Sequence, residues 1–300
     1  MNVLSLFDGI SCGQQALLKA KIKYDVYYAS EIDKASISIT QKNFPSTIQL
    51  GDVKDIDYQL LPKIDLLIGG SPCQSLSPMG TKMGLFGKSG LFYDFVKAMK
   101  ILKPKNYLFE NVKMKKEWMM EISNYFGHSP IEINSNDFVP QNRPRFYWTN
   151  IKVSHIERKP TKLLDILEND VDEKYYLTEK QIEKLDLNYK WVTSGTGIIK
   201  HKGGKHQQDT IYRYDGIMCC LAASHHGAAR HLTKTMLPDG RIRRLTETEC
   251  EKLQGLPPDY TKFDNISSSK RYEMVGNGWT IDAVESILKN INNKETLNLF

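Results

Sequence analysis

Short apolar runs alternate with amphipathic stretches through the first half of the chain. The apolar runs predict strands at residues 2–6, 25–29, 65–69, 106–110 and 146–148. Helical spacing between them predicts helices at residues 13–20, 34–43, 91–102 and 115–126. Strands that alternate with helices indicate an α/β fold, with helices on both faces of a largely parallel sheet. Ligands of such sheets bind beyond the carboxyl ends of the strands.

The pattern weakens after residue 150. Residues 151–189 are mixed and partly acidic, and a helix is expected at 178–185. Residues 193–244 are rich in Gly, His and basic residues, so we expect an inserted, loop-rich domain there. Helical spacing returns at 246–253 and 281–291.

Positive charge is concentrated in this second half. The chain has a net charge of +6, and residues 190–244 hold ten Lys and Arg against three Asp and Glu. This segment therefore carries +7 and the rest of the chain sums to −1. Scattered charge would only favour solubility, whereas charge gathered in one segment favours a surface that faces a polyanion.

Composition excludes several classes of protein. The 300 residues suit one large domain or two small ones. No apolar run is long enough for a membrane span, and the N-terminus has no basic region typical of a signal peptide. The five cysteines (Cys12, Cys73, Cys219, Cys220 and Cys250) form no CxxC pair, which argues against structural zinc and a disulfide framework. We therefore expect no metal and a reducing cytoplasm.

Three motifs at predicted strand ends suggest a nucleoside pocket. FDGISCG at residues 7–13 follows the first strand and opens a helix, where glycines let a ligand approach the backbone. Glu31 ends the second strand and could hold ribose hydroxyls, or could simply cap a helix. Asp52, in GDV, could accept a hydrogen bond from an adenine amino group.

A second group of motifs carries reactive side chains. Cys73 lies in GGSPCQ, and the flanking Gly-Gly and Pro favour an exposed, activatable thiol over a buried apolar one. Residues 74–89 contain three glycines, as a mobile lid would. Glu110 ends the next strand, pointing toward the same crevice. Arg143 and Arg145, in QNRPR, could be surface ion-pair residues or site residues.

The order of these motifs resembles that of the DNA cytosine carbon-5 methyltransferases. FDGISCG, SEID, GDV, GGSPCQS, SGLFYDF, ENV, QNRPR, RRLTETECEKLQGLP and GNGW follow one another as in that family. The resemblance covers nearly the whole chain except residues 155–240. Two motifs depart from the family pattern: Ser11-Cys12-Gly13 stands where many members have Gly-Gly, and Gly276–Trp279 stands where many have Asn-Ser-Val.

The resemblance implies a fold, a cofactor and a reaction. The fold would be a Rossmann-like mixed sheet that binds S-adenosylmethionine, formed by residues 1–150 and 272–300. An inserted target-recognition domain would span residues 151–271. Cys73 would attack carbon 6 of a flipped cytosine, Glu110 would bind ring nitrogen 3, and Arg145 would hold the carbonyl oxygen, with Arg143 shaping the site.

The resemblance also assigns binding residues. Those for the cofactor would be Phe7, Asp8, Gly9, Ser11, Gly13, Glu31, Ile32, Asp52, Val53, Pro72, Leu91, Asn277 and Trp279. Those for double-stranded DNA would be Gln74, Ser75, Lys82, Lys200, Lys202, Lys205, Arg230 and Arg241. We expect Gly276 and Gly278 to place Asn277 in a tight turn. Trp279 could instead be a core anchor for the last helix.

Three other functions are weighed against this one. A tRNA cytosine methyltransferase of the same family would carry a Cys-Phe-Thr segment, which is absent. A non-catalytic DNA-binding relative would have lost Cys73 or Glu110, and a nicotinamide dehydrogenase would carry GxGxxG after the first strand. We expect a monomer in a bacterial or phage-infected cell, with a restriction endonuclease as a candidate partner. The DNA target itself is not predicted.

Overall fold

The chain forms two compact units in a computed structural model that describes residues 1–72, 88–153, 156–185, 190–202, 210–221 and 233–292. Unit 1 comprises Met1–Ile133, Pro144–Glu157 and Ile281–Phe300. Unit 2 comprises Asn134–Arg143 and Arg158–Thr280. The backbone therefore passes between the units four times.

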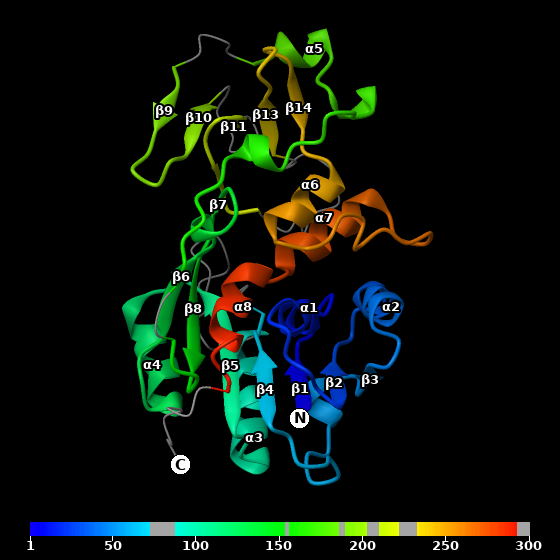
Figure 1. Cartoon of the computed structure of the whole chain (residues 1–300), viewed down its shortest axis with the longest axis vertical. Coiled ribbons are helices and arrows are strands. Elements are labelled where there is room, and N and C mark those ends of the chain that lie inside the picture. The colour runs from blue at the N-terminus through cyan, green and yellow to red at the C-terminus, as the bar shows by residue number, and fades with distance from the viewer. Residues whose placement is uncertain (73–87, 154–155, 186–189, 203–209, 222–232, 293–300) are drawn as a thin grey trace. The chain divides into compact units, whose positions relative to one another are not determined.

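Unit 1 is built on a seven-stranded sheet in the order β3-β2-β1-β4-β5-β8-β6 (Figure 1). These strands are β1 (Asn2–Leu6), β2 (Val26–Ser30), β3 (Ile48–Gln49), β4 (Leu66–Gly69), β5 (Asn106–Val112), β6 (Ile131–Asn134) and β8 (Pro144–Thr149). Strands β1 to β5 pair in parallel, whereas β8 runs antiparallel to β5. The expected α/β fold with a mixed sheet is confirmed.

The helices of unit 1 form close to the predicted positions. They are α1 (Cys12–Lys19), α2 (Lys34–Asn43), α3 (Phe92–Leu102), α4 (Lys116–Phe126) and α8 (Ile281–Leu288). Short 3-10 turns occur at Val53–Asp55 and Lys88–Leu91. Only the end of α8 departs by more than one residue, since helical spacing extends to residue 291.

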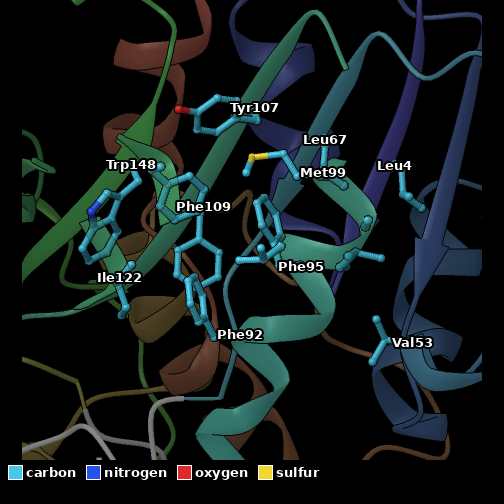
Figure 2. Packing of buried hydrophobic residues seen from close by; sticks show 14 of the residues in the cluster. Leu4, Val53, Leu67, Phe92, Phe95, Met99, Tyr107, Phe109, Ile122 and Trp148 are labelled. Carbon is cyan, nitrogen blue, oxygen red and sulfur yellow. The ribbon is translucent and has the colours of Figure 1, made fainter. Parts of the chain in front are cut away.

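An aromatic core packs α3 and α4 against one face of this sheet (Figure 2). The Phe109 ring on β5 lies 5.3 Å from Phe92 and 4.9 Å from Phe95, both on α3. Trp148, on β8, is completely buried in the same cluster. Burial of such large side chains fixes β5 and β8, which carry Glu110 and Arg145, in one rigid layer.

Helix α1 covers the opposite face of the sheet. A Cβ atom on Gly13 would lie 2.3 Å from Ile68 Cδ1 and 2.8 Å from the Tyr27 hydroxyl, so only glycine lets α1 approach so closely. Helix α8 packs beside α1, and Lys19 contacts Asp282 at 2.6 Å. The last helix, α8, and the first strand, β1, therefore belong to the same unit.

Unit 2 contains a second sheet that the sequence did not predict. Its strands have the order β14-β13-β11-β10-β9 (Figure 1). They are β9 (Val192–Thr193), β10 (Ile199–Lys202), β11 (Thr210–Arg213), β13 (Lys234–Met236) and β14 (Ile242–Arg244). The expectation of a loop-rich region at 193–244 was therefore wrong in part. A separate pair, β7 (Gln141–Asn142) with β12 (Met218–Cys219), runs parallel.

The helices of unit 2 are α5 (Glu179–Ile182), α6 (Glu247–Leu253) and α7 (Ser268–Asn277). Further 3-10 turns occur at Ser135–Asp137, Leu163–Asp165 and Glu173–Tyr175. Because α7 includes Gly276 and ends at Asn277, the tight turn expected around Asn277 was wrong. Within the described ranges, no helix is long and apolar enough to cross a membrane.

A buried ion pair braces unit 2. Arg243 Nη2 on β14 lies 2.6 Å from Glu249 Oε1 on α6, and both side chains are fully buried. Thr246 and Glu249 also form a capping box at the start of α6, which satisfies its first backbone N–H groups. The pair therefore ties the second sheet to the helix that follows it.

Asp8, in the turn between β1 and α1, is a buried carboxyl in unit 1. The Tyr27 hydroxyl donates to Asp8 Oδ1 at 2.8 Å, and the Ser5 and Ser11 hydroxyls also bond to this side chain. Its other oxygen, Oδ2, is buried and finds no hydrogen-bond partner among the described residues. Burial raises the pKa of Asp8 from 3.8 to about 6 despite the three hydroxyls, and the charge of Glu31 adds to the rise.

This pKa predicts that Asp8 destabilises the protein as pH rises. The folded state binds the Asp8 proton more tightly than the unfolded state, so stability falls as pH rises from 3.8 toward 6. The penalty at neutral pH is on the order of 3 kcal/mol. Asp8→Asn keeps an acceptor for Tyr27 without the charge, and should therefore gain stability over the wild type as pH rises.

Urea unfolding of both proteins at pH 4.5 and pH 7.5 measures the effect. The stability difference between Asp8→Asn and wild type should grow by roughly 2 kcal/mol from the lower to the higher pH, because about 1 kcal/mol of the penalty is already present at pH 4.5. A difference that is the same at both pH values would show that the charge on Asp8 carries no burial penalty.

Candidate active site

Glu110 and Arg145 form an ion pair at the ends of two neighbouring strands. Arg145 Nε lies 3.1 Å from Glu110 Oε1, and the two side chains are only 14% and 12% exposed. The antiparallel register of β5 and β8 sets Glu110 opposite Tyr147 and Arg145 opposite Val112, so the pair is a diagonal cross-strand contact. A carboxylate and a guanidinium are thus held together in a largely desolvated position.

The backbone leading to Cys73 is held by the residue after Glu110. Asn111 Nδ2 donates to Ser71 Oγ at 3.3 Å and to the Ser71 carbonyl at 3.4 Å, and both residues are buried. At the end of β4, a Cβ on Gly69 would lie 2.8 Å from the Leu6 carbonyl oxygen, so the strand end demands glycine. Cys73 itself, with Gln74, Ser75 and Lys82, lies outside the described residues.

Sequence reasoning missed the role of Asn111. The residue was recognised only as part of the ENV motif, although a buried amide directly after the predicted strand 106–110 needs hydrogen-bond partners. That requirement could have indicated that the Asn111 side chain binds a neighbouring strand end. The structure supplies its partner, Ser71, from the neighbouring parallel strand end.

Glu31 joins the turns that follow β1 and β2. One carboxylate oxygen accepts from Gly9 N at 2.7 Å, and the other accepts from Ile32 N and Asp33 N at 2.7 and 2.9 Å. Oε2, which accepts only from Gly9 N among the described residues, retains a lone pair for a further donor. Phe7, Gly9 and Glu31 are therefore brought together at the carboxyl ends of two parallel strands.

The remaining unit 1 candidates for cofactor binding follow the same sheet edge. Asp52 accepts from Lys54 N at 3.0 Å, and Val53 is buried in the core cluster. Ile32 is 70% exposed. Pro72 and Leu91 are partly buried.

These residues fit S-adenosylmethionine. Glu31 Oε2 offers an acceptor for a ribose hydroxyl, and exposed Ile32 offers an apolar surface for a base. The first turn of α1 carries no acidic residue, and Ser11 does not cap it with its side chain, so its amides suit a carboxylate. The buried Asp8 Oδ2 atom has no hydrogen-bond partner in the described part of the chain, and such an acceptor favours a cationic ligand.

The other predicted residues belong to unit 2. Asn277 is exposed at the end of α7, and Trp279 is partly exposed two residues later. Arg143 is 4% exposed, and its guanidinium donates to acceptors within unit 2 only. It therefore belongs to a different unit from Glu110 and Arg145.

The candidate DNA-binding residues that can be placed lie on the second sheet of unit 2. Along β10, Lys200 and Lys202 are exposed, while His201 between them is buried, so the two lysines share one face. Arg241 is engaged by Asp239 at 2.7 Å and lies over the Tyr176 ring. Lys205 and Arg230 lie outside the described residues.

Comparison with known proteins gives one family and several methyltransferases as relatives. The family described as C-5 cytosine-specific DNA methylase matches residues 1–293. Orphan methyltransferase M.SPRI of Bacillus phage SPR is 26% identical, with 97% of each chain covered. Type II methyltransferase M.FnuDI of Fusobacterium nucleatum is 28% identical, over 99% of this chain and 95% of its own.

Solved structures agree at the level of the fold. The Entamoeba histolytica methyltransferase EhMeth has a TM-score of 0.71 at 17% identity, with 97% of both chains covered. The Dnmt2 methyltransferase of S. pombe has a TM-score of 0.68 at 18% identity, covering 97% of this chain and 98% of its own. Because the family match takes in nearly every residue, the chain belongs to the C-5 cytosine-specific DNA methylases and is a DNA cytosine-5 methyltransferase.

Proposed function

We propose that this enzyme transfers a methyl group from S-adenosylmethionine to carbon 5 of a flipped cytosine within a short sequence of double-stranded DNA. The ion pair of Glu110 with Arg145 carries the proposal. The edge of a nucleobase carries hydrogen-bond donors and acceptors in one plane, and a carboxyl group beside a guanidinium can bind both kinds. Glu110 and Arg145 provide these two groups from the ends of adjacent strands.

Covalent catalysis by Cys73 explains why these groups are needed. The Cys73 thiolate adds to carbon 6, and Glu110 donates a proton at ring nitrogen 3 as electrons move into the ring. Arg145 holds the carbonyl oxygen, which gains negative charge. When bound, S-adenosylmethionine supplies an electrophilic methyl group. A base then removes the proton from carbon 5, the ring double bond re-forms as Cys73 leaves as a thiolate, and ring nitrogen 3 returns its proton to Glu110.

The proposal extends to the binding residues and domains. The strand-end residues from Phe7 to Leu91, with Asn277 and Trp279, would bind the cofactor. Residues 1–150 and 272–300 would form the catalytic domain, and residues 151–271 the recognition domain. The target would be short, about two to five base pairs, because few side chains of a small domain reach base edges.

The biological setting follows from the relatives. The two curated relatives described above are named as a phage orphan methyltransferase and a bacterial type II methyltransferase, so a bacterial or phage-infected cytoplasm is the proposed location. A cognate restriction endonuclease is the proposed partner, and the enzyme is expected to be a monomer. Bisulfite sequencing of DNA and tRNA from expressing cells tests the substrate: new 5-methylcytosine in tRNA alone would contradict the proposal.

Cys73→Ser should abolish methyl transfer while DNA binding remains, because a serine hydroxyl is a far weaker nucleophile than a thiolate. A duplex that carries 5-fluorocytosine should trap a covalent complex with the wild type, since fluorine cannot leave as the proton does. The complex is measured on denaturing gels. Trapping by Cys73→Ser as well would show that another residue attacks the base.

Glu110→Gln should lower turnover by a factor of roughly 100 or more, because the variant loses a positioned proton donor. Its melting temperature should change little. Glu132→Gln is the matched control, since Glu132 forms an exposed ion pair with Lys113 in the same unit. Should Glu110→Gln melt much earlier yet keep its turnover per folded molecule, Glu110 is a structural residue.

Replacing Lys200 and Lys202 with Gln should flatten the dependence of DNA affinity on salt. Loss of two phosphate contacts reduces the slope of log K against log salt by about 2. Replacing Lys180 and Lys184, two other exposed lysines of unit 2, provides the control. Filter binding over a salt series measures both, and equal slopes in all proteins would mean that the β10 lysines do not contact DNA.

A further inference from the structure

Side chains, in addition to the backbone amide of Gly278, hold the carbonyl groups at and just beyond the end of α7. The last carbonyls of a helix lack intrahelical partners. Here Gln254 Nε2 donates to the Val275 carbonyl at 2.9 Å. Arg143 Nη2 donates to the carbonyls of Gly276 and Gly278 at 3.1 and 2.8 Å. Three carbonyls that flank Asn277 therefore accept hydrogen bonds from two buried side chains.

The other half of the Arg143 guanidinium binds a second segment. Nη1 donates to the Leu221 carbonyl at 3.1 Å and to Cys220 Sγ at 3.2 Å. No carboxylate in the described part of the chain forms an ion pair with this buried cation, and its partners are neutral groups from two separate stretches of backbone. Burying a guanidinium in this way costs free energy, so its retention favours a need for fixed geometry.

A network of neutral side chains completes the same arrangement. Gln141, two residues before Arg143, donates to the Leu253 carbonyl at 3.0 Å and accepts from Leu221 N at 2.6 Å. Thr280 Oγ1 donates to Gln254 Oε1 at 2.8 Å. Gln141, Gln254 and Thr280 are all buried. The backbone of residues 276–280 is therefore fixed from within unit 2, while the Asn277 side chain remains exposed.

We propose that Arg143 is a positioning residue for the cofactor, whose guanidinium fixes the backbone that presents Asn277 and Trp279. This rests on the proposed cofactor role of those two residues. It assigns the two arginines of QNRPR different tasks: Arg145 acts beside Glu110 on the base, and Arg143 acts through the 276–280 backbone. Gln254 supports the same backbone through the carbonyl of Val275.

Arg143→Lys tests the proposal, because one ammonium group cannot span both segments as a planar fork does. In the protein without cofactor, hydrogen exchange at the 278–280 amides should accelerate. Calorimetry with S-adenosylhomocysteine should show binding weakened by about tenfold, the size expected when a buried hydrogen bond is lost. The single-turnover rate at saturating cofactor should fall much less than affinity.

Two controls separate positioning from other effects. Arg243→Lys removes a buried guanidinium from the same unit at its pair with Glu249, so it should lower the melting temperature and leave the dissociation constant unchanged. Arg145→Lys should show the opposite split, with a slower single turnover and normal cofactor binding. If Arg143→Lys does not fold, Gln254→Met provides the same readouts through the Val275 carbonyl.

Each outcome bears on the proposal. Faster exchange with weakened binding supports it. Normal binding with a rate loss like that of Arg145→Lys overturns it and makes Arg143 a base-contacting residue. Faster exchange with unchanged binding also overturns it, since the backbone would then not serve the cofactor. If the wild type itself neither binds S-adenosylhomocysteine nor methylates DNA, the proposed function fails first, and this inference fails with it.

Discussion

The antiparallel pairing of β8 with β5 is the interaction on which the candidate chemistry depends. Strands β1 to β5 all run the same way, and each leaves its functional residues at one edge of the sheet. In a strand that runs in the opposite direction, the first residues lie at that same edge, so they can place a second polar side chain there. Arg145, the second residue of β8, therefore meets Glu110 near the end of β5. The buried aromatic cluster holds both strands in register.

The sequence predicted the elements whose periodicity is long and clean. Strands β1, β2 and β4 and four of the unit 1 helices lie within one residue of their predicted bounds, and β5 extends two residues further than predicted. Burial on both faces makes each of these strands a continuous apolar run. The second sheet of unit 2 was missed because its strands have only two to four residues, too few for an alternating pattern to stand out. Helix α7 was not predicted, because Gly276 and Gly278 favour a turn around Asn277, whereas the helix extends through Gly276 to Asn277.

The candidate site, too, was predicted from the sequence only in part. Motif order indicated which residue types gather at the sheet edge, but the diagonal contact between Glu110 and Arg145 depends on cross-strand register, which the spacing of motifs does not specify. Arg143 was harder still. Three of its four acceptors are backbone carbonyls, so no side-chain pattern elsewhere in the chain reveals them. Arg243, by contrast, has a carboxylate partner six residues away, and that kind of pairing can be suspected from sequence.

A single proline separates two arginines that belong to different compact units. Arg143 is the last residue of one segment of unit 2, and Pro144 is the first residue of the next segment of unit 1. Proline has a fixed φ angle and no amide hydrogen at this boundary. This has a practical meaning for chimeric enzymes built to change DNA specificity. A transplanted recognition module would need to bring residues 134–143 and the stretch up to Thr280 together with its sheet. A graft cut as one continuous block would separate a donor guanidinium from its acceptor carbonyls and leave both buried without partners.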